Sequence, residues 1–271
     1  MKRIIFCLLY DRGNFMMSRN FRLQVVGNIE WLLNNYDFAN VSRGLDEMMI
    51  LDVSRGERNS VEFLSIAKRI AGQCFIPLTL GGGITSIDLA QQYLYNGADK
   101  VLINSLFRDD PKACQEIVSR FGRQCVIAGI DYKKSNDHGY EIYVDRGSKS
   151  IDITLGEWIE HVLHLGAGEL FLQSINQDGT GMGLDTSVTT PWSSQPDVPC
   201  ILVGGVGHGE HVIEGLKTPG VDAVATANLF NFVESAFVDL RPLLVKHSID
   251  LPLWDADAFK PLKDSLAAGS N

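Results

Sequence analysis

An internal repeat constrains the fold of this chain more than any other feature of its sequence. Residues 78–84 (LTLGGGI) and 201–207 (ILVGGVG) are both apolar runs that end in glycines, and the two runs are offset by 123 positions. The segments that follow them, 97–101 (GADKV) and 220–224 (GVDAV), keep the same offset. Repetition on this scale predicts a fold built from two similar halves.

Both glycine runs lie between a predicted strand and a predicted helix. Glycines at such a position let main-chain N–H groups approach an anion, and the helix N-terminus favours negative charge there. We therefore interpret the runs as two phosphate-binding loops, one in each half. Tight turns without a ligand are the alternative, because glycine occurs in turns of many kinds.

Eight short β-rich runs alternate with longer helical stretches along the chain. The predicted strands are 3–9, 47–53, 76–80, 100–104, 124–131, 169–174, 198–204 and 222–227. The predicted helices are 28–41, 60–73, 86–96, 110–121, 154–166, 186–192, 209–216 and 232–247. Apolar strands that alternate with amphipathic helices are typical of a parallel sheet covered by helices. Eight such units in two halves predict an α/β fold, a single (β/α)8 TIM barrel, with a doubly wound open sheet as the alternative.

The chain is expected to form one domain. Residues 1–248 are the predicted barrel, and residues 249–271 are a predicted C-terminal extension that is partly frayed. The polar stretch 133–152 is predicted to form a small hairpin around His138 and Gly139.

Charge and composition exclude several classes of function. The formal net charge is -9 and no basic stripe accompanies the tryptophans, so we expect no nucleic-acid partner. The apolar run 4–9 is too short for a signal peptide or a membrane span, which predicts a cytoplasmic protein without membrane contact. We predict no metal site and no cofactor, because no third donor at ligand spacing supports either histidine pair, His161 with His164 or His208 with His211.

Polar residues at the carboxyl ends of the strands form the active site in a barrel of this kind. Asp131 follows an apolar strand, and a partly desolvated carboxylate there is suited to general acid or base catalysis. A helix or turn cap is the alternative role for Asp131. The predicted turn at Asp178, Gly179 and Thr180 offers a hydroxyl and amides that are suited to complete the second anion site.

A second pattern lies at the opposite rim. Two positive and two negative side chains each stand directly before an apolar strand, and they are Arg3, Glu47, Lys100 and Glu169. A barrel would bring these four charges together as a ring at the bottom of its axis. The ring is then either a salt-bridge plug that closes the barrel floor or a gate that admits a small polar molecule.

Motifs at the strand ends resemble one family. They are residues 2–8, 78–84, 98–105 and 128–131, and 166–169 together with 178–180. In combination they resemble the cyclase subunit of imidazole glycerol phosphate synthase (HisF), over residues 2–247. The resemblance implies a two-fold duplicated (β/α)8 barrel with a separate glutaminase subunit docked on its N-terminal face. It further implies that ammonia passes through a charged gate to a doubly phosphorylated ribulosyl substrate at the C-terminal face.

The resemblance assigns roles to individual positions. The gate corresponds to Arg3, Glu47, Lys100 and Glu169, and a glutaminase contact corresponds to Asp99. The phosphate sites correspond to Gly83, Asn104 and Ser105 in the first half, and to Asp178, Gly179, Gly205 and Asn228 in the second. Asn228 stands where the family usually has Ser.

Two departures from the family bear on activity. The family uses two aspartates as its acid and base, and Asp131 matches the one on the fifth strand. Leu9 stands at the first-strand position, and Asp11 is a weak substitute because it falls in the loop. The lysine expected before Asn20 is Met17. Loss of one of two acid/base groups typically costs about 10² to 10⁴ in rate, so ordinary histidine-pathway cyclisation is not the leading expectation.

This combination resembles paralogues from surface-polysaccharide synthesis. There a glutaminase and a cyclase-like barrel supply ammonia to a third enzyme, which converts an N-acetyl sugar into its acetamidino derivative. Our leading hypothesis is an ammonia-channelling barrel subunit of a glutamine amidotransferase, with a glutaminase, a phosphorylated small molecule and a sugar-modifying enzyme as partners. The alternatives are an intact imidazole glycerol phosphate cyclase, an aldose-ketose isomerase that the retained gate charges disfavour, and a ligand-sensing scaffold that activates the glutaminase without catalysis of its own.

Overall fold

The structure is a computed structural model that describes residues 1–135, 139–190, 196–227 and 236–252. Its centre is a sheet of eight parallel strands, β1 (Arg3–Asp11), β4 (Glu47–Asp52), β5 (Leu78–Gly81), β6 (Lys100–Ile103), β7 (Val126–Ser135), β10 (Glu169–Ser174), β11 (Cys200–Val203) and β12 (Ala223–Thr226). Each strand pairs with the next of this set, and β12 returns to pair with β1, where Arg3 lies opposite Ala223. The sheet is closed. The predicted (β/α)8 barrel is therefore confirmed, and the open-sheet alternative is wrong.

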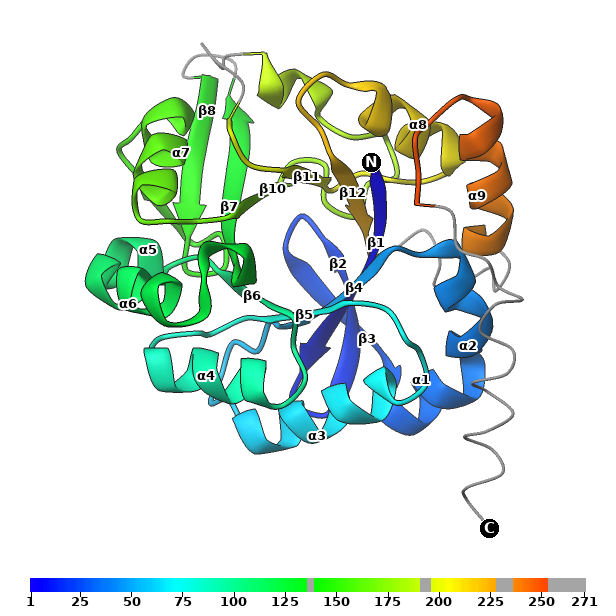
Figure 1. Ribbon diagram of the computed structural model, residues 1–271, viewed down its shortest axis with the longest axis horizontal. Coiled ribbons are helices and arrows are strands. Elements are labelled where there is room, and N and C mark those ends of the chain that lie inside the picture. The colour runs from blue at the N-terminus through cyan, green and yellow to red at the C-terminus, as the bar shows by residue number, and fades with distance from the viewer. Residues whose placement is uncertain (136–138, 191–195, 228–235, 253–271) are drawn as a thin grey trace.

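Helices surround the strands in Figure 1. They are α1 (Ile29–Asn35), α2 (Phe38–Val41), α3 (Ser60–Ala71), α4 (Ile87–Tyr95), α5 (Leu106–Asp109), α6 (Pro111–Phe121), α7 (Leu155–His164), α8 (Gly209–Lys217) and α9 (Ala236–Lys246). Short 3₁₀ turns occur at η1 (Ser42–Gly44), η2 (Arg123–Cys125) and η3 (Thr186–Thr189).

Side-chain caps explain where several helices begin. Asn59 caps α3 by accepting a hydrogen bond from the Glu62 N–H, and Thr154 and Glu157 form a reciprocal capping box on α7. The helix predicted over 28–41 is divided, because the Asp37 side chain caps a new start at α2. In place of the helix predicted over 186–192, the described residues form only the 3₁₀ turn η3, and residues 191–195 lie outside them.

Alternate residues of a barrel strand face two separate cores. Along β1, Ile4 and Phe6 pack outward beneath the helices, whereas Ile5, Cys7 and Leu9 face the barrel interior. The outer core is the larger of the two, and it holds the helices on the barrel. The inner core lines the axis between the two rims with apolar side chains.

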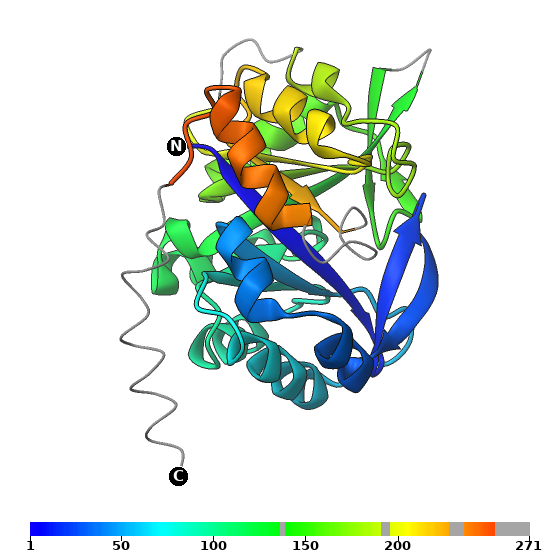
Figure 2. The ribbon, with the colours of Figure 1, turned by 90° about the vertical axis from the view of Figure 1, so that its right-hand side faces the viewer.

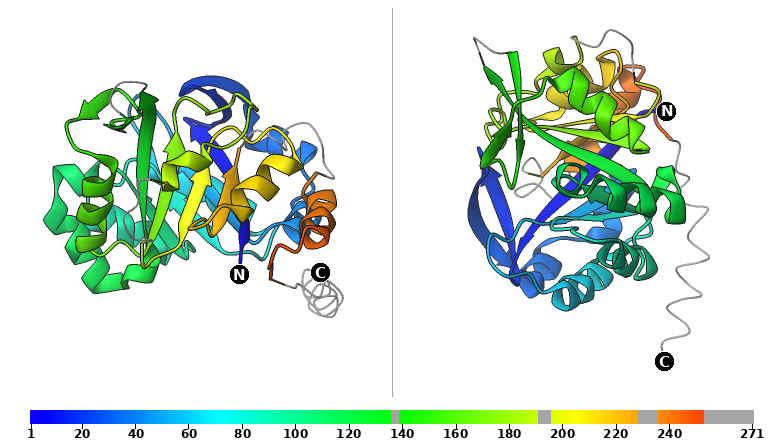
Figure 3. Two further views of the ribbon diagram at one scale, coloured as in Figure 1. Left: turned by 90° about the horizontal axis from the view of Figure 1, so that it is seen from above. Right: turned by 90° about the vertical axis from the view of Figure 1, so that its left-hand side faces the viewer.

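A β-hairpin extends the first strand of each half of the barrel. After β1 come β2 (Asn14–Arg19) and β3 (Arg22–Asn28), and after β7 come β8 (Gly139–Val144) and β9 (Lys149–Ile151). Figures 2 and 3 show both hairpins on the side of the barrel away from the N-terminus. The β2–β3 hairpin was not predicted. The hairpin predicted within 133–152 is present and includes the additional strand β9, although His138 lies outside the described residues.

Each hairpin is anchored by residues of the opposite half. The Asp178 carboxylate, beyond β10, accepts hydrogen bonds from Ser18 Oγ at 2.5 Å and from the Phe21 N–H at 2.9 Å. In the other direction, Ser105 Oγ, beyond β6, accepts a hydrogen bond from the Asp145 N–H at 3.2 Å. These contacts hold both hairpins at the carboxyl-end rim of the barrel.

The first residues of the predicted C-terminal extension pack on the barrel. Ile249 and Leu251 are buried, and the Asp250 carbonyl accepts a hydrogen bond from the Lys2 N–H at 2.6 Å. Residues 253–271 lie outside the described part of the chain. Among the described helices, none has the length and apolar character needed to cross a membrane.

Candidate functional site

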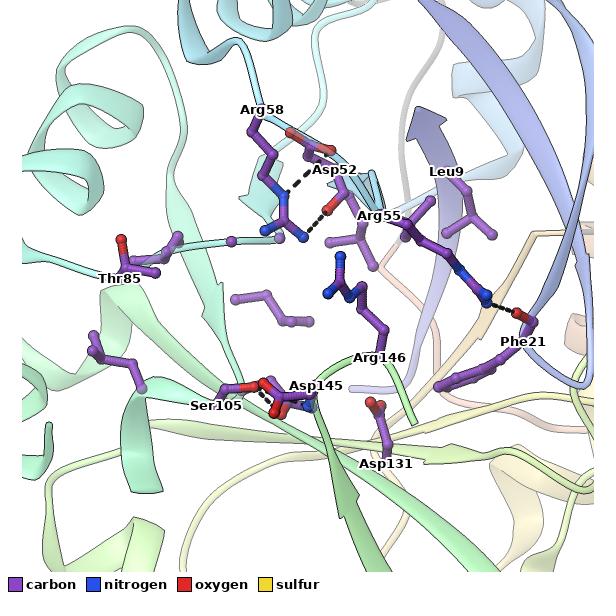
Figure 4. A pocket seen from close by; sticks show the side chains of 18 of the residues that line it. Leu9, Phe21, Asp52, Arg55, Arg58, Thr85, Ser105, Asp131, Asp145 and Arg146 are labelled. Atoms are coloured by element: carbon purple, nitrogen blue, oxygen red, sulfur yellow. Dashed lines mark hydrogen bonds and ion pairs between the residues drawn. The ribbon is translucent and has the colours of Figure 1, made fainter. Parts of the chain in front are cut away.

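A pocket of about 350 Å³ opens at the carboxyl ends of the barrel strands. Of the residues predicted from the sequence, it is lined by Leu9, Gly83, Asn104, Ser105 and Asp131. Figure 4 shows the Asp131 carboxylate pointing into the cavity, with Leu9 on another wall. The barrel therefore brings the residues predicted to bind the first phosphate, and Asp131, into one cavity.

Asp131 is a buried carboxyl group with a raised pKa. It lies on β7 opposite Gln173 of β10, and only 8% of its surface is exposed. Burial raises the pKa of Asp131 to about 7; the Asn104 side chain opposes this shift by hydrogen bonding, and the charge of Asp178 adds to it. A carboxyl group with a pKa near neutrality both donates and accepts protons efficiently at that pH.

Leu9 makes the neighbouring wall of the pocket apolar. Its side chain is buried with Leu51 and Leu102 in the inner core, and all three line the cavity. The expectation that Asp11 falls in the loop is wrong, because pairing with β2 extends β1 and makes Asp11 its last residue. Its carboxylate accepts a hydrogen bond from Arg12 Nε at 2.9 Å. Asp11 is not among the described residues that line the pocket, so it does not supply the carboxylate that Leu9 lacks there.

Two consecutive glycines of the first-half loop adopt a backbone conformation that other residues rarely adopt. Gly82 and Gly83 have φ values of 91° and 65°. A Cβ atom on Gly83 would lie 2.6 Å from the Arg58 side chain, so the loop and this arginine are in close contact. Ser105 Oγ lies 3.4 Å from Asn104 Oδ1 at the same wall.

Three of the predicted second-half residues, but not Thr180, line a smaller cavity of about 30 Å³, which shares Leu9, Leu51 and Gln173 with the first. Asp178, Gly179 and Gly205 form part of its lining. The Thr180 hydroxyl donates a hydrogen bond to the Gln177 carbonyl at 2.8 Å. Asn228, predicted for the same site, lies outside the described residues.

Asp178 has a structural role that the sequence did not indicate. Its carboxylate is buried, which raises its pKa, and hydrogen bonds from Ser18 and the Phe21 N–H oppose that rise. A Cβ atom on Gly179 would lie 2.8 Å from the Arg19 Cα, so the two segments touch. Residues predicted to bind phosphate thus also fix the β2–β3 hairpin.

The four charges predicted at the opposite rim do form a closed ring. Arg3 Nη1 lies 2.5 Å from Glu47 Oε1, and Arg3 Nη2 binds Glu169 Oε1. Lys100 Nζ lies 3.2 Å from Glu47 Oε2 and 2.8 Å from Glu169 Oε2. Burial lowers the pKa of Arg3, but the two carboxylates outweigh burial and raise it above its ordinary value. Each charge therefore contacts two charges of opposite sign.

Asp99 lies at the same rim, next to the ring. It is exposed, and its carboxylate accepts a hydrogen bond from the Leu78 N–H at 2.8 Å. Its predicted contact with a glutaminase stays a prediction.

Sequence reasoning missed three arginines in the pocket. Arg55 and Arg58 lie on the loop between β4 and α3, and Arg146 lies in the turn between β8 and β9. All three are labelled in Figure 4. One feature of the sequence could have revealed two of them. Arg55 and Arg58 follow Asp52, the last residue of the second barrel strand, and loops after barrel strands lie at the active-site rim.

In the described part of the chain, no group of three or more potential metal ligands converges at the histidine pairs. The rings of His208 and His211 lie 3.7 Å apart, and His211 Nδ1 accepts a hydrogen bond from the Gly207 N–H. His161 contacts the Phe107 carbonyl at 3.1 Å. Local packing accounts for these side chains.

Comparison with known proteins agrees with this geometry. Residues 3–235 match a family model described as histidine biosynthesis protein. A protein provisionally named imidazole glycerol phosphate synthase subunit hisF2, from Parasynechococcus marenigrum, is 40% identical over 255 residues, which cover 93% of this chain and 94% of that protein. Imidazole glycerol phosphate synthase subunit HisF of Streptococcus mutans is 35% identical over 252 residues, covering 92% and 98%. The corresponding subunit of Bacillus cereus strain G9842 is 34% identical over 253 residues, covering 93% and 99%. The chain therefore belongs to the histidine biosynthesis protein family and, within it, to the HisF subunits of imidazole glycerol phosphate synthase.

Proposed function

We propose that this chain is the ammonia-receiving barrel subunit of a glutamine amidotransferase. A glutaminase subunit docks on its N-terminal face, next to Asp99, and releases ammonia there. The observation that carries this proposal is the intact ring of Arg3, Glu47, Lys100 and Glu169 beneath a site whose first-strand carboxylate is replaced by Leu9.

The interior of the barrel suits passage of neutral ammonia. Above the ring, the axis is lined by apolar side chains that include Ile5, Met49 and Phe171. An ammonium ion would lose its hydration in such surroundings at a high cost in free energy, whereas ammonia would not carry that penalty. The ring and the apolar axis together therefore favour transfer of the neutral molecule.

The upper site is poorly equipped for ordinary cyclisation. Leu9 cannot transfer a proton, so Asp131 acts without the second carboxylate of the family pair. Met17, half-buried on β2, replaces a lysine expected at that position. We infer that the ammonia leaves the barrel for a separate acceptor, an N-acetyl sugar that a third enzyme converts into its acetamidino derivative in surface-polysaccharide synthesis.

The second candidate function is cyclisation in histidine biosynthesis. The names of the HisF relatives from Streptococcus mutans and Bacillus cereus favour it, as does the raised pKa of Asp131. The third is a ligand-sensing scaffold that activates the glutaminase, and the two glycine loops favour that reading.

An ammonia-dependent cyclase assay separates the proposed function from cyclisation in histidine biosynthesis, and an assay of the complex with the glutaminase tests the scaffold. The purified chain is mixed with ammonium above pH 8 and the histidine-pathway ribulosyl bisphosphate, and loss of substrate is followed by absorbance. We expect no turnover for the natural chain and measurable turnover for Leu9→Asp, which restores the carboxylate pair. Turnover by the natural chain at the rate of an ordinary cyclase would favour the histidine pathway instead. A glutaminase that is activated by a phosphorylated ligand, with no transfer of ammonia, would favour the scaffold.

A further inference from the structure

Residues 181–183 (Gly-Met-Gly), here called the strap, lie against the glycine loop of the second half, residues 204–207. The Gly183 N–H donates a hydrogen bond to the Gly205 carbonyl at 2.8 Å. A Cβ atom on Gly205 would overlap the Gly183 oxygen. The two main chains are therefore in direct contact, and only glycine leaves room for that approach on the loop.

One side chain, His211, touches both segments. Its Nδ1 accepts a hydrogen bond from the Gly207 N–H at 3.1 Å. At another atom of the ring, a Cβ atom on Gly183 would lie 3.5 Å from His211 Cδ2, which is van der Waals contact. The imidazole therefore links the loop to the strap.

Helix α8 carries His211 on a rigid base. Val212, Ile213 and Leu216 of this helix are buried in the outer core. The strap and the loop, in contrast, have positive φ values at four glycines, which are Gly181 (69°), Gly183 (101°), Gly204 (102°) and Gly205 (98°). Glycine loses more conformational freedom on folding than any other residue, so these two segments depend on outside contacts for their order.

The hydrogen bond with Gly207 requires one protonation state of His211. A main-chain N–H can only donate, so Nδ1 must accept, which it does in the neutral imidazole that carries its proton on Nε2. A protonated imidazole would place an N–H at Nδ1 against the Gly207 N–H. The link to the loop therefore holds only while His211 is neutral.

The surroundings of His211 favour its neutral form. Burial lowers the pKa of His211, the charge of His208 lowers it further, and the charge of Glu214 opposes both. The His208 ring lies 3.7 Å from the His211 ring, and the strap and the loop carry no ionisable side chain. The ordinary pKa of histidine is about 6.5, so His211 is neutral at pH 7.5 and becomes protonated in more acidic solution.

We propose that neutral His211 is a positioning residue that fixes the second glycine loop against the strap, and that its protonation releases the loop. Gly204, Gly205 and Val206 of the loop line the smaller cavity beside Leu9. The cavity thus keeps its shape in neutral solution and loses it in acid. This proposal goes beyond the proposed function, because it concerns the chain alone and does not depend on transfer of ammonia.

Amide hydrogen exchange of the full chain, measured by mass spectrometry at pH 7.5, 6.5 and 5.5, tests the proposal. Protection factors, which correct for the pH dependence of chemical exchange, are compared for peptides that cover 181–183 and 204–207. We expect the protection of both segments to fall at least threefold between pH 7.5 and pH 5.5. The barrel strands β4 and β10 should keep their protection, because the release is local.

Variants identify the group that titrates. His211→Asn supplies an amide oxygen that accepts the same hydrogen bond and does not titrate, so protection should stay high at all three pH values. His211→Ala lacks the acceptor, so protection should be low throughout. His208→Asn removes the neighbouring charge, and the fall should already be larger than that of the natural chain at pH 6.5. His164→Asn changes an exposed histidine at the end of α7 and, as the matched control, should keep the natural pH dependence.

Equal protection of the strap and the loop at all three pH values in the natural chain overturns the proposal. It is likewise overturned if His211→Asn shows the same fall as the natural chain, since another group would then titrate. Natural protection of both segments in His211→Ala at pH 7.5, or an equal loss in the barrel strands at pH 5.5, would also contradict it.

Discussion

Lys100 Nζ lies 2.8 Å from Glu169 Oε2, although β6 and β10 are separated by β7 in the barrel. The contact closes the charged ring across the axis. If the ring gates ammonia, Lys100→Ala should uncouple glutamine hydrolysis from product formation in the complex with the glutaminase. Glu47 and Glu169 keep Arg3 as a partner, so the fold should persist with a loss of about 3 kcal/mol in the free energy of unfolding.

The measurement is the ratio of glutamate released to aminated product formed, with urea denaturation for stability. Glu169→Ala should uncouple the two reactions as well. Lys112→Ala changes an exposed lysine on α6 and is the matched control. Unchanged coupling in both ring variants would mean that the ring only closes the barrel floor.

Asp131 predicts a pH dependence of stability. Burial raises its pKa to about 7 in the folded chain, above its value of about 4 in the unfolded chain, so the folded state binds the proton more tightly. Its contribution to stability is therefore greatest below pH 4 and falls as the pH rises towards 7. Asp131→Asn removes this fall and should gain stability relative to the natural chain, up to about 4 kcal/mol above pH 7.

Urea denaturation of both proteins between pH 5 and pH 8 gives the difference. Asp152→Asn, at an exposed position, should show no such trend relative to the natural chain. Parallel stability curves for Asp131→Asn and the natural chain would contradict the shift in pKa.

Asp178 predicts a local effect on the β2–β3 hairpin. Asp178→Ala removes the acceptor for Ser18 Oγ and the Phe21 N–H, and should lower the free energy of unfolding by roughly 2 kcal/mol. Because the hairpin loses its anchor, amide hydrogen exchange should rise in residues 14–28 more than in the barrel strands. Asp197→Ala, at an exposed position, provides the control. Uniformly increased exchange, or none, would show that Asp178 does not hold the hairpin specifically.

Gly83 and Gly97 form a matched pair for the anion site. Both have positive φ values, 65° and 107°, so alanine should cost about 1 kcal/mol in backbone strain at residue 83 and up to about 3 kcal/mol at residue 97. A Cβ atom at residue 83 would meet the Arg58 side chain, whereas none of the described atoms lies within 4 Å of one at residue 97. Gly83→Ala alone should therefore weaken phosphate binding, which titration of both variants measures. Equal phosphate affinity in the two variants would mean that Arg58 does not contribute to phosphate binding.

The barrel and its charged ring were predictable because they depend on patterns that recur along the chain. The glycine repeat locates two strand ends, and each ring residue, such as Arg3 or Lys100, stands directly before an apolar strand. The ring follows once the strands are closed into a barrel, since their first residues then share one rim.

The positions of the two hairpins, and of Arg146 in the pocket, depend on contacts between segments that are distant in the sequence. The β2–β3 turn at Asn20 and Phe21 has positive φ at both residues. Asn-Gly is the usual sequence for such a turn, and because Phe stands at the second position the sequence did not predict a hairpin there. Its anchor, Asp178, stands far along the chain. Arg146 likewise enters the pocket only because Ser105 fixes the turn that carries it, and no local periodicity reveals such an arrangement.

The crossed anchoring of the two hairpins means that neither half of the duplication is self-sufficient at the rim. Asp178 of the second half accepts a hydrogen bond from the hairpin of the first half, and Ser105 of the first half accepts one from the β8–β9 turn of the second. The hairpins at the mouth of the barrel therefore depend on contacts between the two halves. A substitution of Asp178 or Ser105 is expected to alter the hairpin that belongs to the other half.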